Sequence, residues 1–307
     1  MSIIKSIQDL QQYVRVNVSV MEKSFLPYAN DASEKFLNRY IGEALLTELD
    51  THHNSTSTPL PYPAWADNDE KKAIFRQVLK LAQNALAKFT LLLASPHYDL
   101  QLTEMGFVVQ QNSNTTPASA ERVKKAVESY ESQGWDNMET LLRYLEKHHA
   151  IITSYKDSDA FVLATRNLIN TAEVFDRYVN IEASRLKFIK LRPAMDDVEL
   201  IHIEPVISVA LADALRTQQR ENSLTDDNKK LLPILQRAIA NLVAAREMKK
   251  EGAEHYGNHY LVEAKKLLDK DPDKYPLYKE SEQYVATKTG YAYHENTEEA
   301  KNFVFGG

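Results

Sequence analysis

The chain has 307 residues, of which 43% are hydrophobic, and this is enough to fold around a sizeable core. Its formal net charge of −6 argues against a general electrostatic attraction to nucleic acid or to anionic membranes. The absence of cysteine excludes disulfides, thiolate metal sites and a cysteine nucleophile, and the 8 glycines favour long helices over a turn-rich β fold.

The start of the chain shows no signal-peptide core. Residues 1–10 mix charged with apolar side chains, and the longest apolar run, residues 89–94, is far too short to cross a bilayer. We therefore expect a cytoplasmic protein without membrane contact.

Helical periodicity dominates the first part of the chain. Ser6 and Asp9 form a capping pair for a helix that runs through Tyr13. Residues 14–20 alternate between apolar and polar side chains, so this segment could be a strand. A helix, a proline-rich loop and a second helix that opens with a capping pair at Asp67 and Glu70 follow at residues 27–49, 50–66 and 67–94.

The period changes at residues 99–112, where Gly106 can turn and the following residues favour extended backbone. This segment predicts a hairpin or a lone edge strand. Thr116 and Pro117 then predict a helix start, and that helix continues past Gly134 as far as Leu145.

Residues 158–193 predict one central helix, in which Pro193 marks the end. Its buried face is indicated by apolar residues three or four apart: Phe161, Ala164, Leu168, Ala172, Phe175 and Val179. Further helices are predicted for residues 203–220, for residues 225–250 with Thr225 as the cap, and for residues 253–269. The tail from Lys270 has no apolar period.

The second half of the chain resembles the first, which predicts an internal duplication. When Ser6 is set against Thr171, similar residues coincide over three helical segments. The matched pairs include Tyr13 with Tyr178, Leu10 with Phe175, Leu26 with Leu191, Ile41 with Ile207, Leu49 with Leu215, Leu79 with Leu235 and Leu86 with Leu242.

We therefore expect a mainly α protein of two related helical modules with a small strand-containing insertion between them. The expected boundaries are residues 1–95 for module A, 96–157 for a linking segment, 158–270 for module B and 271–307 for a C-terminal tail.

Few residues suggest chemistry. His255, His259 and Glu263 would share one face of a helix, and two histidines with a carboxylate can bind zinc. The spacing is not that of the metalloproteases, so a solvated polar face is the favoured interpretation. Phosphate-binding glycine loops and nucleophile elbows are absent from the sequence, and we expect no catalytic residue, cofactor or metal.

Two segments favour protein contacts. Tyr62 and Trp65 lie in a loop stiffened by proline, which suits an interface, although Trp65 could instead anchor the next helix to its own core. Phe303, Val304 and Phe305 form an apolar tip that could add a strand to a partner's sheet, or simply fold back on the chain.

The N-terminal module resembles the helical head–tail connector, or head-completion, proteins of tailed phages. The similarity lies in residues 7–14, IQDLQQYV, and residues 29–42, ANDASEKFLNRYIG. The whole chain is also similar to an uncharacterised group of prophage-type proteins, through residues 105–107, residues 117–119 and the central stretch 170–193.

This resemblance implies a non-enzymatic virion structural or assembly protein. Its partners would be further copies of the chain in a ring, with portal or tail proteins, and it carries no nucleic-acid signature. Two alternatives stay open: a metal-dependent hydrolase that uses His255, His259 and Glu263, and a cytosolic helical scaffold or adaptor.

Overall fold

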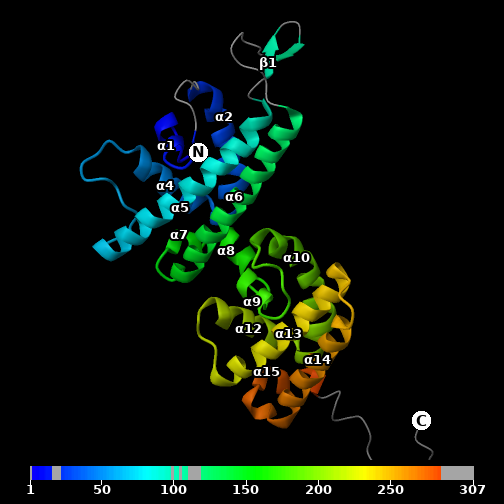
Figure 1. Ribbon diagram of the computed structural model, residues 1–307. Helices are drawn as coiled ribbons and strands as arrows, with labels where there is room; N and C mark the ends of the chain where they lie inside the picture. The colour runs from blue at the N-terminus through cyan, green and yellow to red at the C-terminus, as the bar shows by residue number, and fades with distance from the viewer. Residues whose placement is uncertain (1, 16–21, 98–99, 104–105, 110–118, 285–307) are drawn as a thin grey trace, which may run out of the picture. The chain divides into compact units, whose positions relative to one another are not determined.

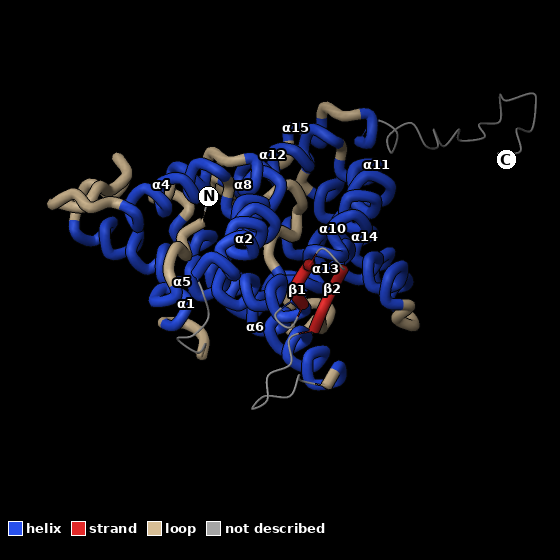
Figure 2. Tube along the Cα trace, turned by 90° about the horizontal axis from the view of Figure 1, so that it is seen from above, coloured by secondary structure: helices blue, strands red, loops and turns tan. Residues whose placement is uncertain are grey.

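The computed structural model describes residues 2–15, 22–97, 100–103, 106–109 and 119–284. Helices make up most of this described chain, as the tube view shows (Figure 2). Contacts divide it into two units, each described here by itself. Unit 1 comprises Met1–Arg166, Asn170–Glu173 and Ile181–Lys190, and unit 2 comprises Asn167–Ile169, Val174–Asn180 and Leu191–Gly307.

Unit 1 is built on two long helices, α5 and α6, which lie side by side over much of their length (Figure 1). Its elements in order are α1 (Ile7–Gln11), α2 (Glu22–Ala32), the π-helix η1 (Ser33–Asn38), α3 (Arg39–Ile41), α4 (Glu43–Asn54), α5 (Asp69–Ala94), the 3-10 helix η2 (Ser95–His97), strands β1 (Leu100–Thr103) and β2 (Gly106–Val109), α6 (Ala120–His148), α7 (Thr153–Lys156) and α8 (Asp159–Ala164).

The strands β1 and β2 form an antiparallel hairpin between α5 and α6, with Leu100 opposite Val109 and Thr103 opposite Gly106. The hairpin falls within residues 99–112, where the sequence changes period. Residues 16–20 of the other strand candidate lie outside the described residues.

Unit 2 is built on the helix pair α13 and α14. The elements that follow α8 are α9 (Ala172–Asp176), α10 (Arg185–Val198), the π-helix η3 (Glu199–Ile203), α11 (Glu204–Ile207), α12 (Val209–Arg220), α13 (Asp226–Met248), α14 (Ala253–Lys270), the 3-10 helix η4 (Pro272–Lys274) and α15 (Pro276–Lys279). Residues of α9 and α10 contribute to both units.

Both units contain the same unusual backbone turn. In unit 1 a π-helix is followed by the short α3 and by Gly42, which has φ 84° and ψ 154°. In unit 2 a π-helix is followed by the short α11 and by Ser208, which has φ 80° and ψ 148°. A positive φ strains a side-chain-bearing residue, and the Ser208 hydroxyl offsets this by accepting a hydrogen bond from the Leu211 amide at 3.2 Å.

A glycine sets the approach of the long helices in each pair. A Cβ added to Gly134 of α6 would lie 2.6 Å from the Phe89 ring, and one added to Gly257 of α14 would lie 2.6 Å from Leu242 Cγ. Side chains at these two positions would push the helices apart, so glycine permits the close packing of both pairs.

Several predicted helix ends are confirmed. Ser6 and Asp9 form a capping box on α1, and Thr225 caps α13. The capping pair predicted for α5, Asp67 with Glu70, is wrong. The cap is Asn68, whose side chain accepts a hydrogen bond from the Lys71 amide at 2.9 Å.

The single central helix predicted for residues 158–193 is wrong. The chain leaves the helix after α8, and the Leu168 amide and carbonyl bond to side chains instead of to helical neighbours. Those bonds replace the lost helical ones, so the apolar residues become buried without a continuous helix. Pro193 is also not a stop, because it lies inside α10, as Pro27 lies inside α2.

The predicted linking segment of residues 96–157 is not separate from the first module. It supplies α6, which packs against α5 within unit 1. The start of the tail also belongs to a folded unit, because Tyr275 and Tyr278 are buried in unit 2.

Candidate functional site

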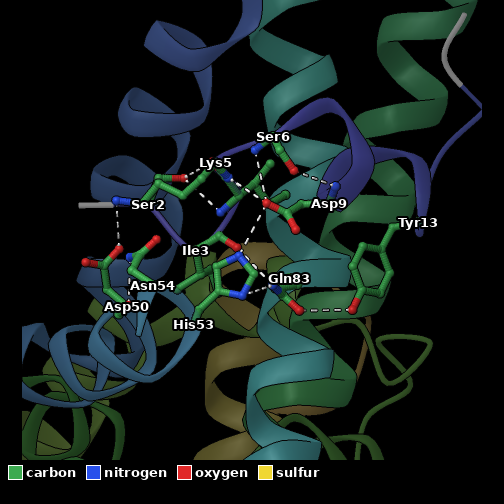
Figure 3. Close-up of polar contacts among 11 residues, drawn as sticks. Ser2, Ile3, Lys5, Ser6, Asp9, Tyr13, Asp50, His53, Asn54 and Gln83 are labelled. Carbon is green, nitrogen blue, oxygen red and sulfur yellow. Dashed lines mark hydrogen bonds and ion pairs between the residues drawn. The ribbon is translucent and has the colours of Figure 1, made fainter. Parts of the chain in front are cut away.

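A buried glutamine joins the start of the chain to the long helix α5 in unit 1. Gln83 donates from its amide nitrogen to the Ile3 carbonyl at 2.9 Å, and its oxygen accepts from the Tyr13 hydroxyl at 3.1 Å (Figure 3). Ile3 is fully buried. The contact therefore satisfies two buried polar groups and fixes the N-terminal segment to the helix.

Next to Gln83 lies an ionisable pair. His53 Nε2 of α4 is 3.3 Å from Asp9 Oδ2, and His53 Nδ1 is 3.4 Å from Gln83 Nε2 (Figure 3). Burial would raise the pKa of the Asp9 carboxyl. Hydrogen bonds donated by Lys5 and Ser6, together with the charge of His53, instead hold this pKa below its usual value. Asp9 is therefore an ionised helix cap.

Histidine paired with aspartate is a familiar catalytic arrangement, but it needs a nucleophile or substrate at the free ring nitrogen. Here the Gln83 amide faces that nitrogen. The nearby Tyr13 hydroxyl bonds to Gln83, and burial followed by the charge of Asp9 raises the pKa of Tyr13. The arrangement thus holds neutral and ionised groups in place without an activated nucleophile.

Unit 2 repeats the glutamine contact. Gln236 of α13 donates to the Leu168 carbonyl at 2.8 Å, and its oxygen accepts from the Tyr178 hydroxyl at 3.4 Å. A second glutamine, Gln219 of α12, donates to the same carbonyl at 3.2 Å.

The charged group beside this second contact differs from the pair in unit 1. Glu199 of η3 accepts from the Leu168 amide at 2.7 Å and pairs with Arg216 at 2.8 Å. Only 2% of Glu199 is exposed. Burial raises the pKa of Glu199 despite the opposing effect of Arg216, which also binds Glu204 at 2.8 Å.

A third group of charged side chains lies in unit 1, where Arg185 contacts two glutamates of α6. Arg185 has its Nε 2.7 Å from Glu139 and its Nη1 2.8 Å from Glu146, and its side chain is only 2% exposed. Burial disfavours its charge, but Glu146 and then Glu139 raise the pKa of Arg185 above its usual value. Arg143 supplies a second positive charge 3.5 Å from Glu139. Because the positive and negative charges then balance, the cluster is suited to holding segments together.

An open depression of about 720 Å³ lies in unit 1, between the turn at Gly42 and the start of α8. Its lining mixes charges of both signs, among them Arg39, Glu43 and Asp159. The Ser158 hydroxyl donates to the Tyr155 carbonyl at 2.6 Å and caps α8, so it is not available as a nucleophile.

The structure places the two aromatic interface candidates of the loop differently. Trp65 is buried beside Phe75, and its indole nitrogen donates to Glu48 at 3.0 Å. It therefore anchors the loop to its own core. Tyr62 is half-buried, contacts the rings of His52 and Phe75, and has the Lys72 ammonium 5.6 Å from its ring centre. Its role at an interface stays a prediction. Phe303, Val304 and Phe305 lie outside the described residues.

The metal alternative receives no support from the side-chain positions. His255 and His259 are exposed on α14, and the Glu263 carboxylate is 2.9 Å from the Lys266 ammonium. Within the part of the chain that the structure describes, no group of three histidine, aspartate or glutamate side chains could hold a metal ion.

The sequence interpretation missed both glutamines, Gln83 and Gln236. Each lies on a helix face that is otherwise apolar, which is the signal that could have marked them as buried polar groups needing partners.

Comparison with protein families gives one match, described as "Family of unknown function (DUF6712)", over residues 37–162 and 249–288. These ranges cover more than half of the chain. The protein belongs to the DUF6712 family. No curated protein and no solved structure gives a significant match. Among helices of the described residues, none in this DUF6712 protein is long and apolar enough to cross a membrane.

Proposed function

We propose that this DUF6712 protein is a non-enzymatic structural or assembly protein, of the head–tail connector type, built from two copies of one helical module. The observation that carries the proposal is the repeated contact of a tyrosine, a glutamine and a backbone carbonyl. A side chain that recurs with the same partners in both units serves the fold they share, not a single catalytic centre.

The first support for two modules is the spacing of this contact. Ile3 and Tyr13 are separated by as many residues as Leu168 and Tyr178. Aligning Gln83 with Gln236 sets Phe89 against Leu242, and these residues face Gly134 and Gly257. The sequence comparison had instead aligned Leu86 with Leu242. For this third helical segment, the structural alignment therefore differs from the expected one by three residues.

The ends of the two units provide the second support. Residues 155–158 read YKDS and residues 278–281 read YKES. In both, the serine hydroxyl donates to the carbonyl of the tyrosine at 2.6 Å. The tyrosine rings also meet a later aromatic ring at similar geometry, Tyr155 with Phe161 at 5.2 Å and Tyr278 with Tyr284 at 5.6 Å.

The hairpin then corresponds to an insertion in one copy. In unit 2 the pair α13 and α14 is joined by a short turn, in which Lys249 and Gly252 have φ of 50° and 72°. In unit 1 the hairpin of β1 and β2 lies at the same place in the chain. The family match over residues 249–288 contains α14 and α15 of unit 2. In the two-module alignment these helices correspond to α6 and α7, near the end of the match over residues 37–162.

The assembly role itself rests on the resemblance of residues 7–14 and 29–42 to connector proteins. In this proposal the protein is made in the cytoplasm, associates with itself into a ring and binds portal or tail proteins in a virion. Since each chain would carry two modules, a ring would need half as many chains as one built from single modules.

Sedimentation velocity of the full chain over a wide concentration range tests the proposal, with purified portal rings added in a second series. We expect oligomers, or binding to the rings. A protein that stays monomeric at every concentration and does not bind the portal rings would contradict the assembly role. Stoichiometric zinc in protein purified without added metal would instead favour the hydrolase alternative.

A further inference from the structure

Unit 2 has an exposed apolar face beside the turn at Ser208. Leu200 and Ile201 on η3 are 63% and 59% exposed, and Val209 at the start of α12 is 55% exposed. Pro205 of α11 is also exposed and lies four residues from both Ile201 and Val209. Because α11 contacts both η3 and α12, these four side chains form one surface, which we call the Ser208 face.

Unit 1 has charged side chains at all four of these places. The turns at Gly42 and Ser208 have nearly the same backbone angles, and setting one against the other also matches the buried Ile41 with the buried Ile207. The four residues of the Ser208 face are then matched with exposed Glu34, Lys35, Arg39 and Glu43. The same backbone thus presents charges suited to water in unit 1 and apolar groups in unit 2.

No other described part of the chain exposes apolar side chains so densely. Among the described residues, three exposed large hydrophobic side chains fall within ten consecutive residues only at the Ser208 face. Val162 and Leu163 of α8, 44% and 51% exposed, form the next group. Single exposed apolar residues are ordinary, but a contiguous group marks a contact site, because covering it removes apolar area from water.

The charges that flank the Ser208 face already have partners within unit 2. Asp197, one helical turn before the face, lies 2.7 Å from Arg246, and Asp213, one turn after it, lies 2.7 Å from Arg216. The face therefore requires no opposite charge from its partner, and the surface that complements it is uncharged and apolar. Of the surfaces that the structure describes, the one with this composition is the Ser208 face itself.

We propose that the Ser208 face binds the same face of a second copy of this chain. The contact is isologous, so each of its residues is used twice and it closes after two chains. It goes beyond the proposed ring, because it cannot extend into one by itself, and its comparison with unit 1 rests on the two-module proposal. The four residues are few against the roughly 20–30 on each side of a standard interface, so we expect a dimer that dissociates at roughly micromolar concentration.

Exchanging the face for its counterpart in unit 1 tests the contact. The variant L200E/I201K/P205R/V209E introduces the four charged side chains of unit 1 and leaves the net charge unchanged. In sedimentation velocity it should weaken the dimer roughly a hundred-fold, because every substituted position occurs twice in the contact. I201K alone, which keeps Pro205 in place, should weaken it in the same direction. The matched control V162E/L163K should leave association unchanged, and an equal loss in this control would overturn the proposal.

Single cysteines distinguish a symmetric contact from a head-to-tail one, since the chain has no cysteine of its own. Residues near a two-fold axis face their own counterparts, so at least one of I201C, P205C and V209C, each oxidised alone, should give disulfide-linked dimers. L163C on the exposed part of α8 measures the yield of random collisions. Yields no higher than that of L163C for all three variants would overturn the symmetric contact.

The outcomes separate this contact from the proposed assembly role. Oligomers that the four-residue variant leaves unchanged overturn the contact and leave the assembly role standing. A wild-type dimer that the variant dissociates, but that neither grows larger nor binds portal rings, supports the contact and contradicts the ring. A V209C/F303C variant that closes a disulfide within one chain would identify the chain's own tail as the occupant and overturn the proposal.

Discussion

Units 1 and 2 share the same uncharged contact and differ in the charges around it. Gln83 and Gln236 each join a tyrosine hydroxyl to the carbonyl of a buried aliphatic residue. Beside them unit 1 has Asp9 with His53, whereas unit 2 has Glu199 with Arg216. In both units the glutamine satisfies the carbonyl of a fully buried residue, Ile3 or Leu168.

The charged groups are free to diverge because each pair needs only its own partner. Asp9 is a helix cap near the surface, while Glu199 is a buried carboxylate that binds a backbone amide. This difference teaches that, if the two units are copies of one module as we propose, the uncharged contact serves their common fold and the charged pairs distinguish them.

The largest expected effect concerns the buried contact of Arg185 with α6. Arg185→Ala should lower the free energy of unfolding by about 3–5 kcal/mol, because Glu139 is left buried without its partner. Val262→Ala should change it by less than about 0.5 kcal/mol, because Val262, which matches Glu139 when Gly257 is set against Gly134, is exposed on α14. Chemical denaturation of both variants at a concentration where the protein is monomeric measures the contrast.

A triple variant provides the control for this prediction. Arg185→Met combined with Glu139→Leu and Glu146→Gln should recover most of the loss, since no charge then remains unpaired. Equal destabilisation by Arg185→Ala and Val262→Ala would show that Glu139 and Val262 are not differently covered.

The glutamine contact should matter in both units. Gln83→Ala should cost about 1–3 kcal/mol, because the Ile3 carbonyl and the Tyr13 hydroxyl lose their partner. Gln236→Ala should cost about 1 kcal/mol, because Gln219 still donates to the Leu168 carbonyl. Gln133→Ala on the exposed surface of α6 is the matched control and should have almost no effect. Hydrogen exchange read separately in α5 and α13 shows which unit is weakened; a change confined to one unit for both variants would contradict the shared role.

The glycines between the long helices allow a finer comparison. Gly134→Ala should destabilise unit 1 by about 1–2 kcal/mol, since overpacking against the Phe89 ring outweighs the better helix propensity of alanine. Gly257→Ala should cost at least as much, because the added Cβ would meet Leu242 at Cγ and, at 3.2 Å, at its backbone nitrogen, which cannot move aside. Thermal unfolding of the two variants ranks them, and the reverse order would contradict the packing argument.

The smallest effects should appear as opposite pH dependences. The pKa of Asp9 is lowered on folding, so its contribution to stability is present above its ordinary value of 3.8 and is lost as the pH falls below it. The pKa of Glu199 is raised, so the folded state binds its proton more tightly and its contribution declines as the pH rises above 4.5.

Hydrogen exchange of α5 and α13 in the acid range measures these slopes, after correction for the intrinsic rates. Asp9→Asn should remove the slope in unit 1 and leave unit 2 unchanged, and Glu199→Gln should do the converse. Slopes of the same sign in the two wild-type units would contradict the different roles of the carboxylates.

Local signals in the sequence predicted many helix ends, because a cap depends on residues three positions apart. Ser6 with Asp9 and Thr225 illustrate this. Apolar spacing also identified most buried positions of the central stretch, including Phe161, Leu168 and Phe175. It could not show that the backbone there leaves the helix, because the bonds that replace the helical ones come from distant side chains.

The candidate contacts were less predictable than the helices. Trp65 looked equally suited to a partner and to its own core, and only its contact with Glu48 placed it inside. Nothing in the local sequence of Arg185 indicates that it pairs with Glu139, since the two residues are far apart in the chain.

By itself, the sequence determined that this chain is mainly helical, where several of its helices begin, and which apolar residues are buried, since these depend on local bonding and on the period of the helix. Only the tertiary structure decided how the polar groups are partnered: that Gln83 and Gln236 hold the same kind of carbonyl, that Leu168 leaves the helix, and that Glu139 is covered while Val262 is exposed. The physical reason is that a buried polar group must find a partner wherever the fold brings one, and that distance along the chain does not reveal it.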